Sequence, residues 1–258
     1  MITVSPHATD QDKYIIWLKQ AESFCSAAGL DYIDVLVDQA GTDQPLQNEM
    51  LHLWPAIHWY ALFEGTPEAE TMEYSPVVLR LYFALSSHRK FLAQLMASFA
   101  DTPRLTLLIS PLTFDLLGRH LQVLSQVQWE EQTGLLRYYD NRVFPLLFTH
   151  VLTNEQQATF TDIALFWSWL DRDGEINWKS GSFSPERRLT DNPEMNRVDD
   201  VQVGLMGCIC DAEALMKEKA VSELSQESYF SHCLDIAIRA NDAGIFRGFA
   251  GLRGIILL

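Results

Sequence analysis

Cysteine is scarce in this sequence, and the few cysteines form no recognisable framework. Four cysteines among 258 residues are too few for a disulfide scaffold. A chain of this length with 48% hydrophobic residues can build a core without covalent cross-links. We therefore expect reduced thiols, as in a cytosolic protein.

Long hydrophobic runs are also absent. No uninterrupted stretch of about 18 apolar residues, the length that a membrane-spanning helix needs, occurs in the chain. Residues 1–12 are polar and do not form a positively charged leader with an apolar centre. The sequence predicts a cytoplasmic protein with no membrane partner.

Positive charge is the third scarcity. There are 34 acidic residues and 19 lysines and arginines, which gives a formal net charge of -15. Such a surface repels phosphate groups, so nucleic acid and anionic membranes are poor candidates for the main partner. A basic or apolar protein partner fits better, and the alternative is that the acidity only keeps the protein soluble.

Sequence motifs for phosphate binding, metal binding and nucleophilic catalysis are missing. There is no glycine-rich phosphate loop, no His-Glu-x-x-His and no Gly-x-Ser-x-Gly. Cys208, Cys210, His232 and Cys233 are zinc-ligand types, but a single residue between the first two thiols is too short a spacing for both to face one metal. We expect free thiols there, no metal and no cofactor.

The apolar pattern alternates between strand and helix as far as residue 180. Segments 31–38, 58–65, 77–83, 104–110 and 162–171 are rich in branched or alternating apolar residues and predict strands, with helices between them. Beyond residue 196 only helical periodicity remains. The sequence therefore predicts an α/β fold, with a mixed sheet flanked by helices in residues 1–180, a linker at 181–196 and a C-terminal helical lobe at 197–258.

The segment 135–148 joins a strand pattern directly to a helical pattern, and charged residues lie at the junction. Arg137, Asp140 and Arg142 stand beside two tyrosines, with Asp140 placed as a helix N-cap. An unpaired buried charge costs several kcal/mol, so these three side chains must neutralise one another if they are buried. We expect them to form an ionic framework.

Further candidate contacts lie nearer the start of the chain. Glu64 belongs to a Glu-Gly-Thr-Pro turn, in which Gly65 can adopt positive φ and Pro67 fixes the exit, so Glu64 is expected near the sheet edge and in the ionic framework. Trp54, Trp59 and Tyr139 are candidate aromatic contacts for a partner. For each of these residues, ordinary packing in the core is the alternative.

Four short motifs occur in a characteristic order and spacing. They are Leu62-Phe63-Glu64-Gly65-Thr66-Pro67, Leu107-Leu108-Ile109-Ser110-Pro111, Leu117-Gly118-Arg119-His120-Leu121 and the segment 135–148. From about Trp54 to Leu170 the chain resembles the type VI secretion adaptor family, also called effector chaperones, Tap or TEC proteins. Asn141 stands where the family motif has proline, and asparagine tolerates the same turn.

This resemblance implies a non-catalytic function. Members of the family bind a toxic effector in the bacterial cell that makes it and load it onto the VgrG spike of a contractile injection machine. By the same resemblance, the α/β part is a common platform and the helical lobe recognises the cognate effector. Two alternatives remain open: a small enzyme that uses His120 with a nearby carboxylate, and an immunity protein that binds a toxin.

The segment 244–258 is rich in glycine and apolar residues. Each glycine inside a helix costs about 0.5 to 1 kcal/mol relative to alanine, so a free-standing helix is not expected. Close packing onto the helical lobe and docking onto a partner both fit the pattern.

Overall fold

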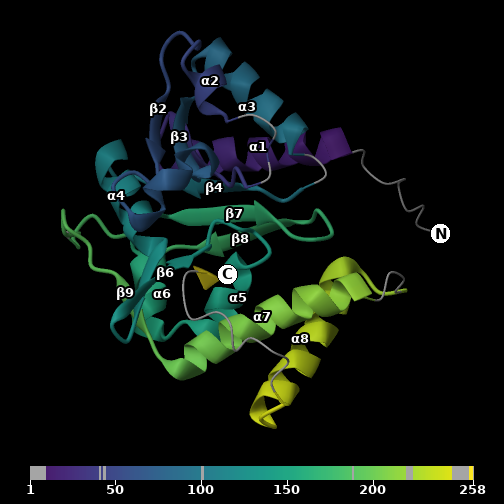
Figure 1. Cartoon of the computed structure of the whole chain (residues 1–258). Coiled ribbons are helices and arrows are strands. Elements are labelled where there is room, and N and C mark those ends of the chain that lie inside the picture. Colours follow the sequence, from purple (N-terminus) through teal and green to yellow (C-terminus); the bar gives the residue numbers. More distant parts are fainter. Residues whose placement is uncertain are drawn as a thin grey trace.

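The computed structural model describes residues 10–40, 42, 45–99, 102–187, 189–218, 223–245 and 256–257. Its centre is a six-stranded sheet in the order β2-β3-β1-β4-β7-β8, and each neighbouring pair is antiparallel (Figure 1). The strands are β1 Tyr32–Val37, β2 His58–Ala61, β3 Val77–Tyr82, β4 Leu105–Ile109, β7 Phe166–Leu170 and β8 Ile176–Ser180. These strands confirm the five strand predictions, with shorter bounds at 58–65, where residues 62–65 form a turn, and at 162–171, where the strand begins at Phe166.

One face of this sheet carries the N-terminal helices. They are α1 Asp10–Ala27, α2 Gln47–Met50 and α3 Ser86–Ser98. In β1, Ile33, Val35 and Val37 point into the core on this side, together with Trp17 and Phe91 from the helices. The apolar alternation of the strands thus decides which face the helices cover.

The opposite face carries the rest of the chain. It holds the helices α4 Phe114–Leu124, α5 Phe144–Leu146, η2 Leu147–Val151 and α6 Asn154–Thr161, and a smaller sheet in the order β10-β6-β5-β9. The strands of that sheet are β5 Gln126–Trp129, β6 Gln132–Leu136, β9 Asn196–Val198 and β10 Ile256–Leu257. Among the described strands, parallel pairing occurs here, between β10 and β6 and between β5 and β9.

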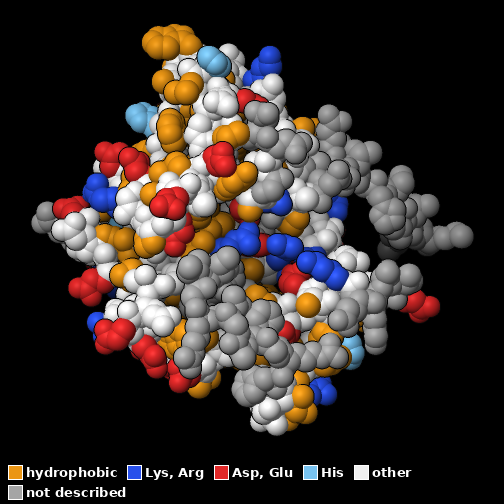
Figure 2. Space-filling model, viewed as in Figure 1, with side chains coloured by type: hydrophobic (Ala, Val, Ile, Leu, Met, Phe, Trp, Pro, Cys, Tyr) orange, Lys and Arg blue, Asp and Glu red, His pale blue; other side chains and the backbone are white. Residues whose placement is uncertain are grey.

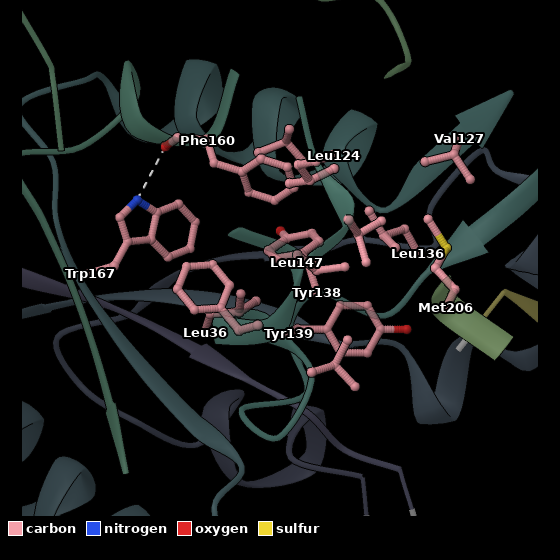
Figure 3. Packing of buried hydrophobic residues seen from close by; sticks show 14 of the residues in the cluster. Leu36, Leu124, Val127, Leu136, Tyr138, Tyr139, Leu147, Phe160, Trp167 and Met206 are labelled. Carbon is pink, nitrogen blue, oxygen red and sulfur yellow. Dashed lines mark hydrogen bonds between the residues drawn. The ribbon is translucent and has the colours of Figure 1, made fainter. Parts of the chain in front are cut away.

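The C-terminal helices share the core of this second face. They are α7 Asp200–Glu218 and α8 Gln226–Asp242. Met206 from α7 lies beside Val127 and Leu136 of the smaller sheet (Figure 3), and Phe230 from α8 belongs to the same buried cluster as Leu36 of β1. The predicted α/β class with a C-terminal helical pair is confirmed. Within the described residues, none of the helices is both long and apolar enough to span a membrane.

The segment between the α/β part and the helices is fixed along the protein surface. Residues 181–187 and 189–195 contain no helix or strand. The Gly181 N–H donates to the carbonyl of Leu165, the Ser182 N–H donates to that of Thr161, and Arg187 forms an ion pair with Asp162. The predictions for 244–258 fall mainly outside the described residues; within that segment, β10 adds a short parallel strand to β6.

Candidate functional site

The loop that follows β6 is anchored by a buried tyrosine. Tyr138 is fully buried, and its hydroxyl donates a hydrogen bond to the Leu121 carbonyl at 2.9 Å. Its ring packs edge-on against Phe160 and Trp167, as Figure 3 shows from close by. This anchor holds the backbone of the loop, and therefore the charged residues on both sides of Tyr138, in one position.

Asp140 and Arg142 form the tightest ion pair of the loop. Asp140 Oδ1 accepts hydrogen bonds from the Arg142 backbone N–H at 3.0 Å and from Nε at 2.9 Å, and Oδ2 accepts one from Nη2 at 2.7 Å. Burial raises the pKa of the Asp140 carboxyl, but the bonds and charge of Arg142 outweigh burial and leave this pKa below its ordinary value. The N-cap prediction for Asp140 was wrong, because helix α5 begins after Val143 and the carboxylate closes the preceding turn instead.

Arg137 extends this pair towards the large sheet. Its Nη2 lies 3.8 Å from Asp140 Oδ2 and 3.3 Å from Asp38 Oδ2, just beyond the end of β1. Arg104 Nη1 is 3.8 Å from the same Asp38 oxygen. Burial raises the pKa of Asp38, and the Ala40 N–H and the two arginines only partly oppose it.

Arg142 and Arg172 extend the network in the other direction, to the C-terminal helices. Arg142 Nη1 lies 3.8 Å from Glu213 Oε2 on α7, and Arg172 Nη2 lies 2.5 Å from Glu213 Oε1. Arg172 Nη1 also pairs with Glu227 on α8 at 3.0 Å, and its guanidinium stacks 3.7 Å from the centre of the Phe230 ring. The Arg172 side chain is only 6% exposed, so this contact is well shielded from water.

The network is balanced in charge and joins the large sheet, the loop after β6, the turn after β7 and the C-terminal helices. It contains four arginines and four carboxylates: Arg104, Arg137, Arg142, Arg172, Asp38, Asp140, Glu213 and Glu227. Figure 2 shows a row of Lys and Arg side chains in the middle of the molecule, between the large sheet and α7. Asp173 adds a further link, because its carboxylate accepts hydrogen bonds from the backbone N–H groups of Gln226 and Glu227 at the start of α8.

Glu64 lies apart from this network. Its side chain is exposed, and within the described part of the chain no salt bridge reaches it. Its carbonyl accepts a hydrogen bond from Gln122 Nε2 on α4 at 2.5 Å, and Gly65 has a φ of +72°, as the turn requires. The Glu-Gly-Thr-Pro segment therefore connects the end of β2 to α4 by a hydrogen bond that its backbone accepts.

The three candidate aromatic residues have different environments. Tyr139 is 3% exposed, and the Arg137 guanidinium lies 6.0 Å from its ring centre. Trp54 is 84% exposed in the loop between α2 and β2, and Trp59 is 39% exposed on β2, an edge strand of the large sheet. Two of the three aromatic side chains are thus accessible to a partner.

His120 is held in a structural position. It is 7% exposed, and its Nε2 lies 3.0 Å from the Thr190 carbonyl oxygen. Burial lowers the pKa of its imidazole, while the Thr190 carbonyl opposes this shift only in part. Next to it, Arg119 and Asp191 lie 3.9 Å apart, so α4 holds the segment that precedes β9 by two contacts.

The described cysteines and acids do not gather into a metal-binding cluster. No group of three or more His, Cys, Asp or Glu side chains with metal-binding geometry is found in the described ranges. All four cysteines are free thiols, with Cys25, Cys208 and Cys233 buried. Burial raises the pKa of the Cys25 thiol to about 12, so this thiol stays protonated at neutral pH.

The sequence predicted only the local part of the network. Arg137, Asp140 and Arg142 lie within six consecutive residues, and their pairing follows from that proximity. Sequence reasoning missed the members contributed by distant elements, which are Asp38, Arg104, Arg172, Glu213 and Glu227. A usable signal was present at Arg172 and Asp173, where two charges occupy a hairpin turn between apolar strands.

Comparison with known proteins locates a family match in the first part of the chain. Residues 35–159 match the family described as "Domain of unknown function (DUF4123)". The match runs from β1 into α6 and contains Trp54, Trp59, Glu64 and the segment 137–142. Arg172 and the two C-terminal helices lie beyond it. No match was found among curated proteins or among solved structures.

Proposed function

We propose that this protein is an adaptor of a type VI secretion system. It binds a cognate toxic effector in the cytoplasm of the producing cell and helps to load it onto the VgrG spike. The observation that carries this proposal is the family match over residues 35–159. It overlaps the stretch from Trp54 onward whose motifs resemble type VI adaptors, and it includes all four motifs completely, the segment 135–148 among them.

The arrangement of the helices supports a division of labour. Helices α7 and α8 follow the matched segment, yet Arg142 of that segment forms an ion pair with Glu213 on α7. Arg172, just beyond the segment, pairs with Glu213 and Glu227 and donates a hydrogen bond to the Arg142 carbonyl. In our proposal the matched platform provides the general contact with the secretion machine, and the C-terminal helical pair recognises the particular effector. The network keeps the two surfaces in a fixed relation, so an effector bound on one side is presented in a constant orientation.

The proposed adaptor does not catalyse a reaction. A general base needs a neighbouring nucleophile or an accessible substrate proton, whereas His120 is buried and its Nε2 is hydrogen-bonded to the Thr190 carbonyl. The lowered pKa of His120 follows from this burial and needs no catalytic role.

The proposal can be tested by co-expression with the effector and the VgrG protein encoded beside it. We expect the tagged adaptor to retain the effector in a complex of defined size and to keep it soluble, with VgrG joining the complex. If neither protein is retained, the adaptor function is wrong. Turnover of a small molecule that is lost in a His120→Ala variant would favour the enzyme alternative.

A matched pair of variants tests the division of labour. Ile236 on α8 and Ile16 on α1 are 44% and 46% exposed, so arginine fits at either position without disturbing the core. We expect Ile236→Arg to reduce effector capture at least several-fold and Ile16→Arg to leave it unchanged. Equal capture by both variants, with folding confirmed by circular dichroism, would place effector recognition outside this face of α8.

A further inference from the structure

Among the described strands, β2 is the edge strand on one side of the large sheet and has no strand partner on its outer side. It pairs with β3 in antiparallel register, with His58 opposite Arg80 and Tyr60 opposite Val78. The Leu62 N–H continues this ladder by donating to the Pro76 carbonyl at 2.9 Å. Because hydrogen bonding alternates along an antiparallel strand, Trp59 directs its backbone N–H and C=O away from β3, towards the open edge.

The edge strand itself carries no charged side chain of the kind that discourages strand addition. β2 contains no Lys, Arg, Asp or Glu, and Trp59 on it is 39% exposed. The loop immediately before it exposes Leu51 to 70% and Trp54 to 84%. At the other end of the sheet, β8 contains Lys179, the kind of residue that discourages strand addition.

The surroundings of the β2 edge are acidic. Residues 45–79 contain five glutamates and neither lysine nor arginine. Glu49, Glu64, Glu70 and Glu73 among them are exposed, and the last two belong to η1 Pro67–Tyr74, which connects β2 to β3. An approaching segment with Lys or Arg side chains is attracted here, whereas an acidic segment is repelled.

We propose that β2 accepts an extended segment of a partner protein as an additional strand, and that this segment alternates apolar side chains with lysine or arginine. Main-chain hydrogen bonds to Trp59 supply affinity, and the exposed tryptophans and glutamates supply selectivity. The inference deepens the proposed function and rests on it for the identity of the partner. A second copy of this chain is the less suitable occupant, because it brings the same acidic surface.

The test uses amide hydrogen exchange of the full chain labelled with nitrogen-15. The probe is a synthetic peptide of alternating lysine and valine, and the control peptide has glutamate in place of lysine. We expect the Trp59 amide to exchange quickly in the free protein and to slow by about tenfold or more at saturating lysine peptide. The glutamate peptide should leave the exchange rate unchanged.

Charge-reversal variants provide the matched control. Glu70→Lys with Glu73→Lys reverses two exposed charges on η1, the connection between β2 and β3, and should weaken binding of the lysine peptide about tenfold or more. Glu130→Lys with Glu131→Lys reverses two exposed charges at the turn between β5 and β6 and should leave binding unchanged. An equal loss of peptide affinity in both double variants would mean that only the net charge of the protein matters, and it would overturn the proposed edge site.

Three results would contradict the inference. The first is an unchanged exchange rate of the Trp59 amide with the lysine peptide, and the second is equal protection of this amide by both peptides. The third is protection of the Trp59 amide in the peptide-free protein together with a dimer in sedimentation velocity. That third result would make a second copy of the chain the occupant of the edge. The same exchange measurement on the co-expressed complex separates this inference from the proposed function. Effector capture without Trp59 protection rejects the strand-addition site alone, whereas peptide binding without effector capture rejects the adaptor function alone.

Discussion

Arg172 brings a positive charge almost out of contact with water, and its surroundings compensate for it. Its side chain is 6% exposed and pairs with Glu213 and Glu227, which are 25% and 29% exposed. Replacement by alanine removes the arginine partner of Glu227, leaves Glu213 with only the longer contact to Arg142, and removes the stacking on Phe230. Since the carboxylates keep some access to water, we expect Arg172→Ala to lower the free energy of unfolding by about 2 to 4 kcal/mol.

The measurement is urea denaturation followed by circular dichroism. Arg239→Ala serves as the control, because Arg239 is 77% exposed and lies 4.0 Å from Asp235 on the same helix. An exposed pair of this kind contributes about 0.5 kcal/mol or less, so the control should unfold like the native chain. A loss for Arg172→Ala no larger than for the control would show that the network does not stabilise the fold.

Asp140 and Asp38 should make opposite contributions to the pH dependence of stability. The pKa of Asp140 is lowered in the folded protein, so the unfolded chain binds more protons and the stabilisation from Asp140 is lost as pH falls below about 4. The pKa of Asp38 is raised, so its contribution is largest in acid and is lost as pH rises through the folded pKa.

Urea titrations of the native chain, Asp140→Asn and Asp38→Asn across this pH range test these signs. We expect the advantage of the native chain over Asp140→Asn to shrink towards acid pH. Its advantage over Asp38→Asn should grow in the same direction. Parallel curves for all three proteins would mean that neither carboxylate changes its pKa on folding.

At the residue scale, the sequence predicted contacts only where the partners are neighbours in the chain. The Asp140 and Arg142 pair needs one turn of backbone, and its charges are visible together in the sequence. Glu213 carries no comparable signal, because an acidic residue on an otherwise ordinary helix is usually solvated. Glu64 was expected in the network because it ends a strand, yet the turn exposes its side chain and uses its backbone instead.

Two glycines show how elements constrain each other. A Cβ added at Gly181 would lie 1.8 Å from the Ala164 carbonyl oxygen, whereas one added at Gly207, within α7, would meet no atom within 4 Å. We expect Gly181→Ala to destabilise the fold by about 2 to 4 kcal/mol, through displacement of the backbone that follows β8. Gly207→Ala should stabilise it by up to about 1 kcal/mol, through helix propensity.

Thermal and urea unfolding of these two variants is the measurement. The native chain is the reference, and the two substitutions add the same methyl group, so their difference reports position alone. A neutral Gly181→Ala would indicate that residues 181–187 can move away from the loop before β7 without loss of stability.

At the element scale, strands were predicted well where both faces are buried. The run Leu105 to Ile109 is entirely buried, and its nearly continuous apolar character, interrupted only by Thr106, was sufficient to assign it. The boundary of β6 was harder to predict, because Arg137, Tyr138 and Tyr139 continue the alternating pattern after the strand has ended at Leu136. There the hydrogen bond of Tyr138 to α4, a tertiary contact, takes precedence over the strand pattern.

The molecule as a whole has two cores, one on each face of the large sheet. The core that includes α7 and α8 also includes Leu36 of β1 and Leu108 of β4. Because those two strands lie at the centre of the sheet, we expect the C-terminal helices and the α/β part to unfold in one cooperative transition.

Two spectroscopic probes can test this cooperativity. All seven tryptophans precede residue 179, so tryptophan fluorescence reports chiefly on the α/β part, with Trp129 also in contact with Asp200 at the start of α7. Far-ultraviolet circular dichroism reports on all helices, including α7 and α8. We expect coincident midpoints in urea, whereas an earlier transition by circular dichroism would show that the helical pair unfolds separately.

The balanced ionic network limits how parts of this protein can be exchanged by recombination. A chimera that joins this α/β part to foreign helices within residues 181–195 would bring Arg172 against helices that need not carry acids at the positions of Glu213 and Glu227. The buried guanidinium would then lose both partners. A crossover point after Phe230 keeps the start of α8, its hydrogen bonds to Asp173 and the neutralised charges together. The replacement must then supply apolar side chains at the positions of Cys233, Leu234 and Ala237, which are buried in the core.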